Sequence, residues 1–378
     1  MNTRTLRQIK SGWLAILIAA LAAGALSVAH MLVNGHGHSF NATREIPWGI
    51  LVSSYEYLMI LSAGLVLWVS YDLVSGHADR LWLHQRGLLL SLLCMAGGFS
   101  LMVAELNHPV RLAIYVLTSP NLASPLWWMG IFYGLLIAAL TLELLIVFKG
   151  LHILSRLGGL FGMLAALGVL ANMGAVLGLL EARAFWHGPF IPVYFLLAAL
   201  LAGGAALAIV GYVEVLRGKS VPARDFDRIG RAMAFFTLGM LFLFAVKIVS
   251  ALYGSPPEKA PAMLALLGGS LSVNFWIFEV CLGILVPLAL LAGLVARTPQ
   301  LVALAGISSL IGAFFMRYDL VIAGQLVPMR EDLAEPVSHL LSYVPSASEI
   351  GIVAGSIALS LLLYTLAEKF LPQERRKD

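Results

Sequence analysis

The stretch WGILVSSYEYLMILSAGLVLWVS, residues Trp48–Ser70, decides how this sequence folds. It is long enough to cross the hydrocarbon core of a bilayer as a single helix, which needs about 20 apolar residues. One acidic residue, Glu56, lies partway along it. Ionisable residues inside membrane spans are costly and rare, and they mark functional sites by default. We therefore interpret Trp48–Ser70 as a transmembrane helix and Glu56 as a candidate functional residue.

Nine further apolar stretches of similar length are spread along the chain. The sequence is 60% hydrophobic and only 12% charged, against about 25% charged residues in soluble proteins. The net charge of +4 comes from basic residues at helix ends, so it does not indicate nucleic-acid binding. The sequence predicts an all-α, polytopic membrane helix bundle in contact with lipid, which forms one domain over residues 1–378. The ten predicted spans lie near residues 12–33, 48–70, 87–107, 126–148, 157–180, 190–216, 231–253, 272–296, 300–317 and 349–370.

Basic residues predict the orientation of the bundle. Alternating the loops places seventeen Lys and Arg residues on the side that holds both termini and six on the other side. Loops rich in Lys and Arg face the cytoplasm, so both termini are predicted to be cytoplasmic. The first span is longer than the apolar core of a signal peptide, and we expect it to be retained. The two longest loops, 108–125 and 318–348, then face outside, as short interfacial helices, a partner-docking surface or ordinary connections.

Polar residues from four spans share one level in the outer half of the membrane. At 1.5 Å of rise per residue, this level is about 9–12 Å below the outer surface, and its members are Glu56, Asn172, Lys247 and Glu279. Lys247 and Glu279 lie on consecutive antiparallel helices at matching depth. An ion pair between them is therefore expected, because a buried charge needs a partner.

Glu56 has no assigned partner, and a lone carboxyl group in hydrocarbon is more stable neutral than charged. Such a group suits the exchange of protons with a ligand. Glu105 and Arg317 are expected just above it, at the outer ends of the third and ninth spans. His36 and His38 lie in the outer loop, where they could relay protons or simply be solvated.

A second set of acidic residues faces the cytoplasm. Asp72 and Glu214 close the second and sixth spans, and we expect them at the interface as helix-end residues. Glu143 lies about 8 Å inside the fourth span, so it is the better candidate for a proton relay. With Glu56 above it, Glu143 makes a proton route across the membrane conceivable.

The sequence offers few ligands for redox metals. Cys94 and Cys281 lie in apolar stretches and supply neither a disulfide framework nor a metal cluster. Haem b needs paired axial histidines, and of nine His only His30 lies clearly within a span. We therefore expect no haem or metal bound by this chain. A secondary transporter or ion-translocating protein with a buried Glu/Lys site stays open as the alternative function.

Short motifs occur in a fixed order along the chain. They are Pro47-Trp48-Gly49, Ala104-Glu105-Leu106 with His108-Pro109-Val110-Arg111, Ser124-Pro125-Leu126-Trp127-Trp128, Phe275-Trp276 with Glu279, Gly283 and Pro287, Arg317-Tyr318-Asp319, and Tyr343-Val344-Pro345-Ser346 with Glu349. Together they resemble the NrfD/PsrC family, the quinone-interacting membrane subunits of polysulfide-reductase-like complexes, and its ten-helix branch in particular. The resemblance covers about residues 12–371.

This resemblance implies a quinone-binding membrane anchor of a multisubunit respiratory oxidoreductase rather than a complete enzyme. It implies menaquinone or ubiquinone as the cofactor, bound towards the outer face. The implied partner there is a four-cluster, ferredoxin-like iron–sulfur subunit, with a molybdopterin, hydrogenase or multihaem cytochrome subunit beyond it. The implied location is the cytoplasmic (inner) membrane of a bacterium or archaeon, within an electron-transport chain.

Three positions depart from the family pattern. Glu56 stands where the polysulfide-reductase branch has a quinone-ligating His. Asn172-Met173-Gly174 replaces a Tyr-Pro-Gly element, and Asp319 replaces an Asn that is usual in the ten-helix branch. On this basis Glu56 is expected to exchange a proton with a ring oxygen, and Asn172 to bond the ring or hold Glu56.

The resulting assignments fall into three groups. The catalytic candidates are Glu56 and Glu143. The quinone-binding candidates are Glu56, Asn172, Lys247, Glu279 and Trp48, with the Lys247–Glu279 pair setting the local potential. The candidate proton path contains His36, His38, Asp72, Glu105, Glu214, Arg317 and Asp319.

Overall fold

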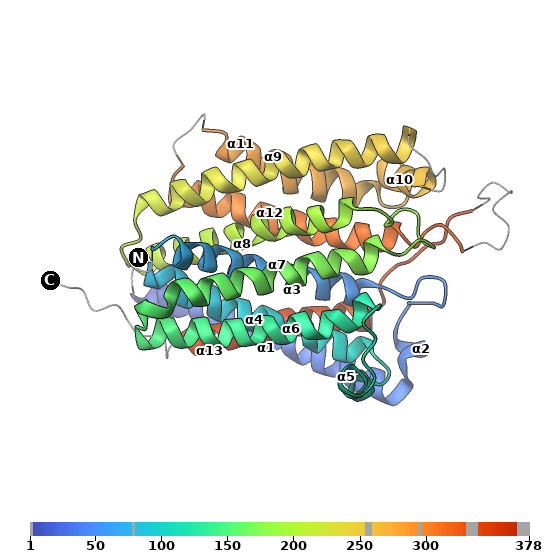
Figure 1. Cartoon of the computed structure of the whole chain (residues 1–378), viewed down its shortest axis with the longest axis horizontal. Helices are drawn as coiled ribbons and strands as arrows, with labels where there is room; N and C mark the ends of the chain where they lie inside the picture. Colours follow the sequence, from blue (N-terminus) through green and yellow to red (C-terminus); the bar gives the residue numbers. More distant parts are fainter. Residues whose placement is uncertain (1–2, 78–79, 254–258, 294–296, 330–338, 369–378) are drawn as a thin grey trace.

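Within the residues that the structure describes, ten helices of the computed structural model are long and apolar enough to cross a membrane (Figure 1). The structure describes residues 3–77, 80–253, 259–293, 297–329 and 339–368. The spanning helices are α1 (Thr3–Asn34), α3 (Ile50–Val74), α4 (Leu81–Glu105), α6 (Pro125–Lys149), α7 (Ser155–Gly178), α8 (Phe190–Leu216), α9 (Ala223–Tyr253), η2 (Asn274–Leu285) continued by α11 (Val286–Leu291), α12 (Pro299–Ala323) and α13 (Ala347–Ala367). The predicted all-α membrane bundle is confirmed, and the described residues contain no strand.

Four short helices join the spans. They are α2 (His36–Ser39), α5 (Pro109–Thr118), the 3-10 turn η1 (His152–Leu154) and α10 (Lys259–Leu267). Helix α5 is seen end-on in Figure 1, where the long helices run horizontally, so it lies across the bundle axis. The loop at 108–125 therefore contains a short helix, as one of the three alternatives predicted.

Helix α3 is the centre of the bundle. Its most apolar window is 89% buried, whereas that of the peripheral helix α1 is 17% buried. Close approach to α8 requires small residues: a Cβ atom at Gly64 would overlap the backbone of Ala199, and one at Gly203 would overlap the backbone of Gly64. Small residues at such crossings allow helix backbones to touch within a membrane. The helix that carries Glu56 is therefore enclosed by protein rather than by lipid.

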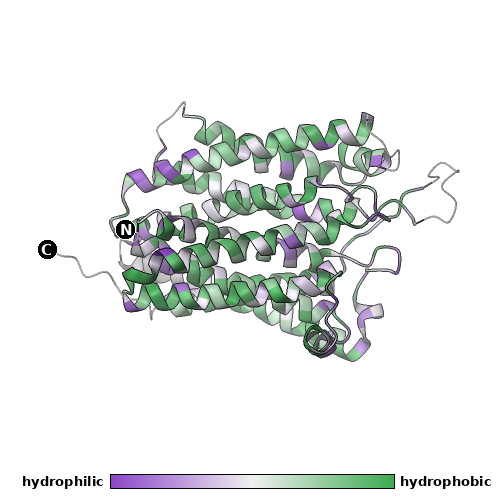
Figure 2. Cartoon of the chain, in the orientation of Figure 1, coloured by the Kyte–Doolittle hydropathy of each residue, from purple (hydrophilic) through white to green (hydrophobic). Residues whose placement is uncertain are grey.

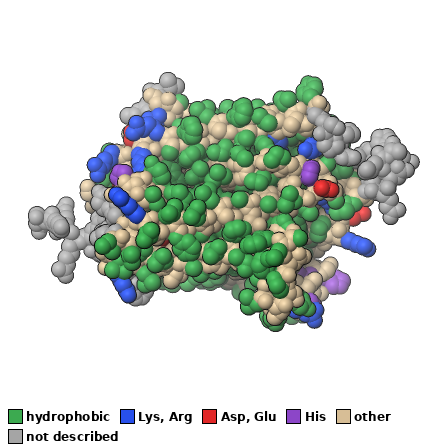
Figure 3. Space-filling model, in the orientation of Figure 1, with side chains coloured by type: hydrophobic (Ala, Val, Ile, Leu, Met, Phe, Trp, Pro, Cys, Tyr) green, Lys and Arg blue, Asp and Glu red, His purple; other side chains and the backbone are tan. Residues whose placement is uncertain are grey.

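Both ends of the chain lie at one end of the bundle. Helix α1 begins and α13 ends on the left of Figure 1, and we call this the proximal end and the opposite one the distal end. Hydrophilic residues gather towards both ends in Figure 2, with apolar residues between them. The face shown in Figure 3 has the same pattern, with Lys and Arg side chains at the ends of an apolar middle. This distribution matches a protein that spans a membrane along its helix axes.

Reporter fusions test the predicted orientation. Because basic residues are more frequent in the loops at the proximal end, that end should be cytoplasmic. Fusions after Glu45 and Asn121, which lie in distal loops, should report the outside, and a fusion after Gly218 should report the cytoplasm. Opposite results at two of these sites would overturn the orientation.

Helix α12 extends further than its sequence predicts. It was expected to end at Arg317, but it continues to Ala323, and Leu320 to Ala323 are all buried. The charged pair at Arg317 and Asp319 resembles a helix end in sequence, yet the apolar residues after it prolong the span. Arg317 therefore lies six residues, or about 9 Å, inside the distal end of its helix, and its predicted place above the polar level was wrong.

Candidate functional site

Polar side chains from several helices lie at one level near the distal end of the bundle. Glu56 lies six residues inside α3, Asn172 six inside α7, Lys247 six inside α9 and Arg317 six inside α12. At 1.5 Å per residue this places each about 9 Å from its helix end. The level predicted from the sequence is therefore present, with Arg317 as an additional member.

Arg317 is the largest fully buried side chain among the described residues, with 1% of its surface exposed. Its guanidinium carbon lies 4.2 Å from the ring centre of Tyr194 and 4.3 Å from that of Phe195, both on α8. Aromatic faces stabilise such a cation through their quadrupoles. By hydrogen-bond geometry, both terminal nitrogens, Nη1 and Nη2, lack a partner among the described residues. The charge is thus supported by rings while its donors stay available.

Glu56 lies as far inside its helix as Arg317 does. Its side chain is buried, its charge interacts with that of Arg317, and its Oε2 atom has no hydrogen-bond partner. Tyr55 of α3, the residue directly before Glu56, and Tyr133 of α6 share a hydrogen bond between their hydroxyl groups. Both phenols interact electrostatically with Glu56. The charge state of Glu56 is therefore influenced by one guanidinium group and by two phenols.

A pair of acidic side chains, one from η2 and one from α12, lies near the same level. Glu279 and Asp319 are both buried and interact with each other, and Asn274 donates a hydrogen bond of 3.0 Å to Asp319 Oδ1. Glu279 lies in η2, a π-helix, a form that is rare and frequent at functional sites. The pairing depends on a close approach of η2 and α12, because a Cβ atom at Gly312 would overlap the backbone of Gly283.

The expected ion pair between Lys247 and Glu279 is not formed. The two groups interact electrostatically, but no contact within 4.0 Å joins them, and the Lys247 ammonium instead lies 4.5 Å from the ring centre of Phe185. Equal depth fixes the level of two residues but not the direction in which they point. Lys247 points towards Phe185 and α8, whereas Glu279 points towards Asp319 on α12.

Asn172 and Trp48 hold the ends of helices. Asn172 donates a hydrogen bond of 2.9 Å to the carbonyl oxygen of Pro125, at the start of α6. The backbone N–H of Trp48 donates a hydrogen bond of 3.0 Å to Gln325 Oε1, and Gln325 Nε2 donates one of 2.8 Å to the carbonyl oxygen of Trp48. The Trp48 ring stacks on that of Trp186 at 5.3 Å. No hydrogen bond joins Asn172 to Glu56 among the described residues.

The two histidines and Glu105 lie at the distal surface. His36 contacts the carbonyl oxygen of Ala104 at 2.9 Å, next to Glu105, while His38 is exposed. Glu105 interacts electrostatically with Glu349 rather than with Glu56. The position of the Glu349 carboxylate is fixed by a hydrogen bond of 2.6 Å that it accepts from the Tyr343 hydroxyl group. These side chains form a separate cluster near the ends of α1, α4 and α13.

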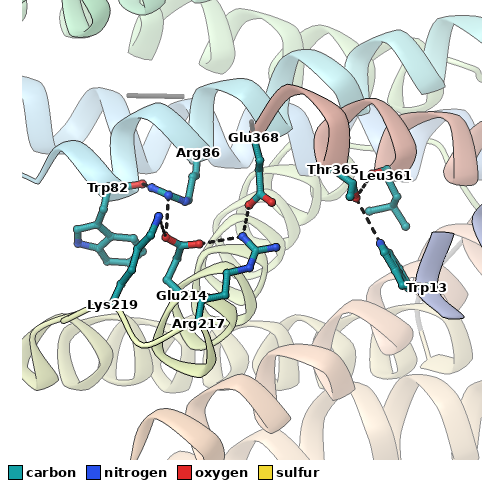
Figure 4. Close-up of polar contacts among 9 residues, drawn as sticks. All are labelled: Trp13, Trp82, Arg86, Glu214, Arg217, Lys219, Leu361, Thr365 and Glu368. Atoms are coloured by element: carbon teal, nitrogen blue, oxygen red, sulfur yellow. Dashed lines mark hydrogen bonds and ion pairs between the residues drawn. The ribbon is translucent and has the colours of Figure 1, made fainter. Parts of the chain in front are cut away.

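At the proximal end, the acidic residues form ion-pair networks. Glu214 forms ion pairs with Arg86 at 2.7 Å, with Lys219 at 2.7 Å and with Arg217 at 3.0 Å, and these side chains are drawn in Figure 4. Burial by itself would lower the pKa of Arg217, but its hydrogen bonds and charge interactions with Glu368 and Glu214 raise it above the ordinary value. Glu214 was expected as an interfacial helix-end residue, and it is instead 1% exposed and multiply paired.

Asp72 was likewise expected at the interface, and it is likewise buried and ion-paired. It is buried and pairs with Arg228 at 2.6 Å and with Arg80 at 3.1 Å. Glu143 differs, because it has no ion-pair partner among the described residues. Its Oε1 accepts a hydrogen bond of 2.7 Å from Ser70, and its Oε2 has no partner. Of these three acids, Glu143 alone keeps the unpaired carboxyl group that a proton relay needs.

Replacing Glu214 by glutamine should destabilise the protein strongly. The change leaves the buried guanidinium of Arg86 without its anion, and breaking a buried pair costs about 3–5 kcal/mol. The control is Asp227→Asn, whose side chain is 42% exposed and whose partners Arg231 and Arg297 are 65% and 19% exposed, because pairs at the surface contribute about 1 kcal/mol or less. Thermal unfolding in detergent measures both. Equal melting temperatures for the two variants would contradict the structural role of Glu214.

Aromatic residues of the site were missed by the sequence analysis. Tyr55 and Tyr133 flank Glu56, and Tyr194 and Phe195 support Arg317. The position of Tyr55 directly before Glu56 was a signal, but nothing in the sequence places Tyr133, Tyr194 or Phe195 beside Glu56 or Arg317. Among the described residues, no group of three or more His, Cys, Asp or Glu side chains is placed to hold a metal ion.

Comparisons with known proteins agree with this architecture. The sequence profile of the family described as "Polysulphide reductase, NrfD" matches residues 38–329. A curated relative, a selenate reductase subunit of Mesobacillus selenatarsenatis, is 23% identical over 369 residues, which cover 86% of this chain and 85% of the relative. The family match contains Glu56, Lys247, Glu279 and Arg317, and the relative is similar over nearly its whole length.

Proposed function

The chain belongs to the NrfD polysulphide reductase family, and we propose that it is the quinone-handling membrane subunit of a multisubunit respiratory oxidoreductase. It would exchange electrons between the quinone pool and an iron–sulfur partner docked at the distal end. The name of the similar reductase subunit supports the wider assignment. The strongest support comes from polar atoms at one level without partners: Glu56 Oε2 and Arg317 Nη1 and Nη2.

These atoms fit the chemistry of a quinone. A quinone or quinol carries two oxygens on a flat apolar ring. A guanidinium group donates hydrogen bonds to such oxygens, and a carboxyl group can accept from a quinol hydroxyl or donate when it is protonated. Tyr194 and Phe195 add aromatic surface beside Arg317. Menaquinone and ubiquinone share this head-group chemistry, and the proposal extends to either.

When bound, a quinone supplies reversible two-electron, two-proton chemistry. Arg317 would orient a ring oxygen through its free donors. Glu56 would hold a proton at Oε2 and exchange it with the quinone at that ring oxygen. Glu279 and Asp319 would tune the local potential together with Lys247. Trp48 and Asn172 would act indirectly, since they fix the distal ends of α3 and α6.

Proton transfer along α3 extends the proposal. Between Glu56 and the Ser70–Glu143 pair lie Ser62 and Ser91, whose hydroxyl oxygens are 2.8 Å apart. These groups form a discontinuous series of proton-holding side chains from the distal level towards the proximal end. Water molecules would have to complete the series.

Purification with its partners separates this function from a transporter. The chain should co-purify with a four-cluster, ferredoxin-like iron–sulfur subunit, and the complex should bind a quinol analogue. The chain itself should contain no haem or metal. Solute uptake by the chain alone in liposomes, without quinol binding, would favour the transporter instead.

A further inference from the structure

A pocket opens between the distal part of α9, the start of α10 and the chain segment that leads into α8. The pocket is open and small, with a volume of about 40 Å³ accessible to water, and nine described residues line it. Phe185 and Phe190 give it aromatic walls, while Lys247 and Lys259 bring two positive charges. None of the nine residues is acidic. The pocket is thus apolar and cationic at once.

Lys247 has no ionic partner in this pocket. Neither a hydrogen bond nor an ion pair engages its ammonium group among the described residues, and its near neighbours are the rings of Phe185 and Tyr194, at 4.5 Å and 5.9 Å. A charge at this depth of a membrane is costly unless it is paired or reaches water. The carboxyl groups of Glu279 and Asp319 interact with it only from a distance.

Lys259 supplies the second cation at the membrane surface. It is the first residue of α10, and its Nζ atom donates one hydrogen bond of 3.2 Å to the carbonyl oxygen of His187. An ammonium group has three donors, so two remain for a ligand. Lys247 lies about 9 Å deeper along α9 and can extend its side chain towards the surface, as lysines near helix ends do.

Below the pocket, α9 exposes apolar side chains in a row. Phe242, Val246 and Val249 are 67%, 40% and 57% exposed, and their spacing places them on one face of the helix. Ser250 lines the pocket beside this row. A ligand with an anionic head and an apolar tail matches both the cationic pocket and the apolar row on α9. A quinone, which is neutral, would leave the two lysines uncompensated.

We propose that this pocket binds the phosphate-bearing headgroup of an anionic phospholipid, held by Lys247 and Lys259, with an acyl chain along the exposed face of α9. A phosphate group supplies the negative charge that the two ammonium groups lack, and a lysine near an anionic membrane surface contributes about 1 kcal/mol. The site shares Lys247 with the Glu56–Arg317 level, but neither Glu56 nor Arg317 lines it, and lipid binding can be measured without any redox partner.

Native mass spectrometry of the purified full-length protein with defined lipids tests this site. Phosphatidylglycerol should bind more tightly than phosphatidylcholine, which has a zwitterionic headgroup. Lys259→Gln and Lys247→Gln should each weaken phosphatidylglycerol binding about fivefold. The matched control is Arg44→Gln, which removes a positive charge from an exposed distal loop outside the pocket, and it should leave the preference unchanged.

A competition arm distinguishes the possible sources of phosphate. Inorganic phosphate at millimolar concentration should displace little lipid, because it lacks the apolar tail. Efficient displacement by phosphate would overturn the lipid assignment. Equal binding of the two lipids, or a preference that persists in Lys259→Gln, would overturn the site itself. Should Lys247→Gln fail to accumulate, Lys259→Gln alone decides the outcome.

Discussion

Replacing Glu56 by glutamine is expected to lower quinone-linked turnover by about 100-fold or more while the complex still assembles. Glutamine has nearly the shape of glutamate but cannot hold and release a proton at Oε2. General acid–base catalysis contributes about 10²–10⁴-fold, which sets the size of the loss. The measurement is quinol oxidation or quinone reduction per assembled complex.

The matched control for this variant is Glu181→Gln. Glu181 lies in an exposed distal loop, so the change removes one carboxyl group outside the buried level. Its turnover should equal that of the parent protein. If Glu56→Gln also turns over at the parental rate in a fully assembled complex, Glu56 has no part in the reaction.

Replacing Arg317 should have the second large effect, on both assembly and turnover of the complex. Arg317→Met removes the cation that interacts with Glu56 and Glu279, and loss of one partner from a buried charge cluster costs about 3–5 kcal/mol. We therefore expect far less assembled complex in the membrane. Arg317→Lys keeps the charge but loses the planar, five-donor group that stacks on Tyr194, and the two cations are not interchangeable at such sites.

Arg317→Lys should accordingly assemble but turn over at least about tenfold more slowly. Native gels measure assembly, and quinone-linked activity per complex measures turnover. Arg44→Met is the control for loss of a distal arginine, since Arg44 is exposed, and it should affect neither quantity. Normal assembly and normal turnover in Arg317→Met would show that the buried cation is dispensable.

The sequence predicts the bundle and the depth of its polar residues well, because both follow from length. Apolar runs define the spans, and a rise of 1.5 Å per residue converts sequence position into depth. Glu56, Asn172 and Lys247 accordingly share the predicted level. The predicted distal end of the ninth span was wrong. Arg317 and Asp319 resemble a helix terminus in sequence, but the helix continues to Ala323.

The partners at that level could not be predicted in the same way. Which way a side chain points depends on the rotation and packing of its helix, and these are set by contacts between segments far apart in the sequence. Lys247 and Glu279 therefore point to different neighbours despite their equal depth. The burial of Asp72 and Glu214 was missed for a related reason, because arginines from other helices form their ion pairs.

Photolabelling with a quinone analogue tests the central proposal most directly. The purified complex would be irradiated with a photoreactive quinone in the presence and absence of excess unlabelled quinone, and the labelled peptides mapped by mass spectrometry. We predict competed labels in α3 around Glu56, in α12 around Arg317, or in α8 around Tyr194. Competed labels confined to α1 and α13, or no label that unlabelled quinone removes, would contradict a quinone site at this level.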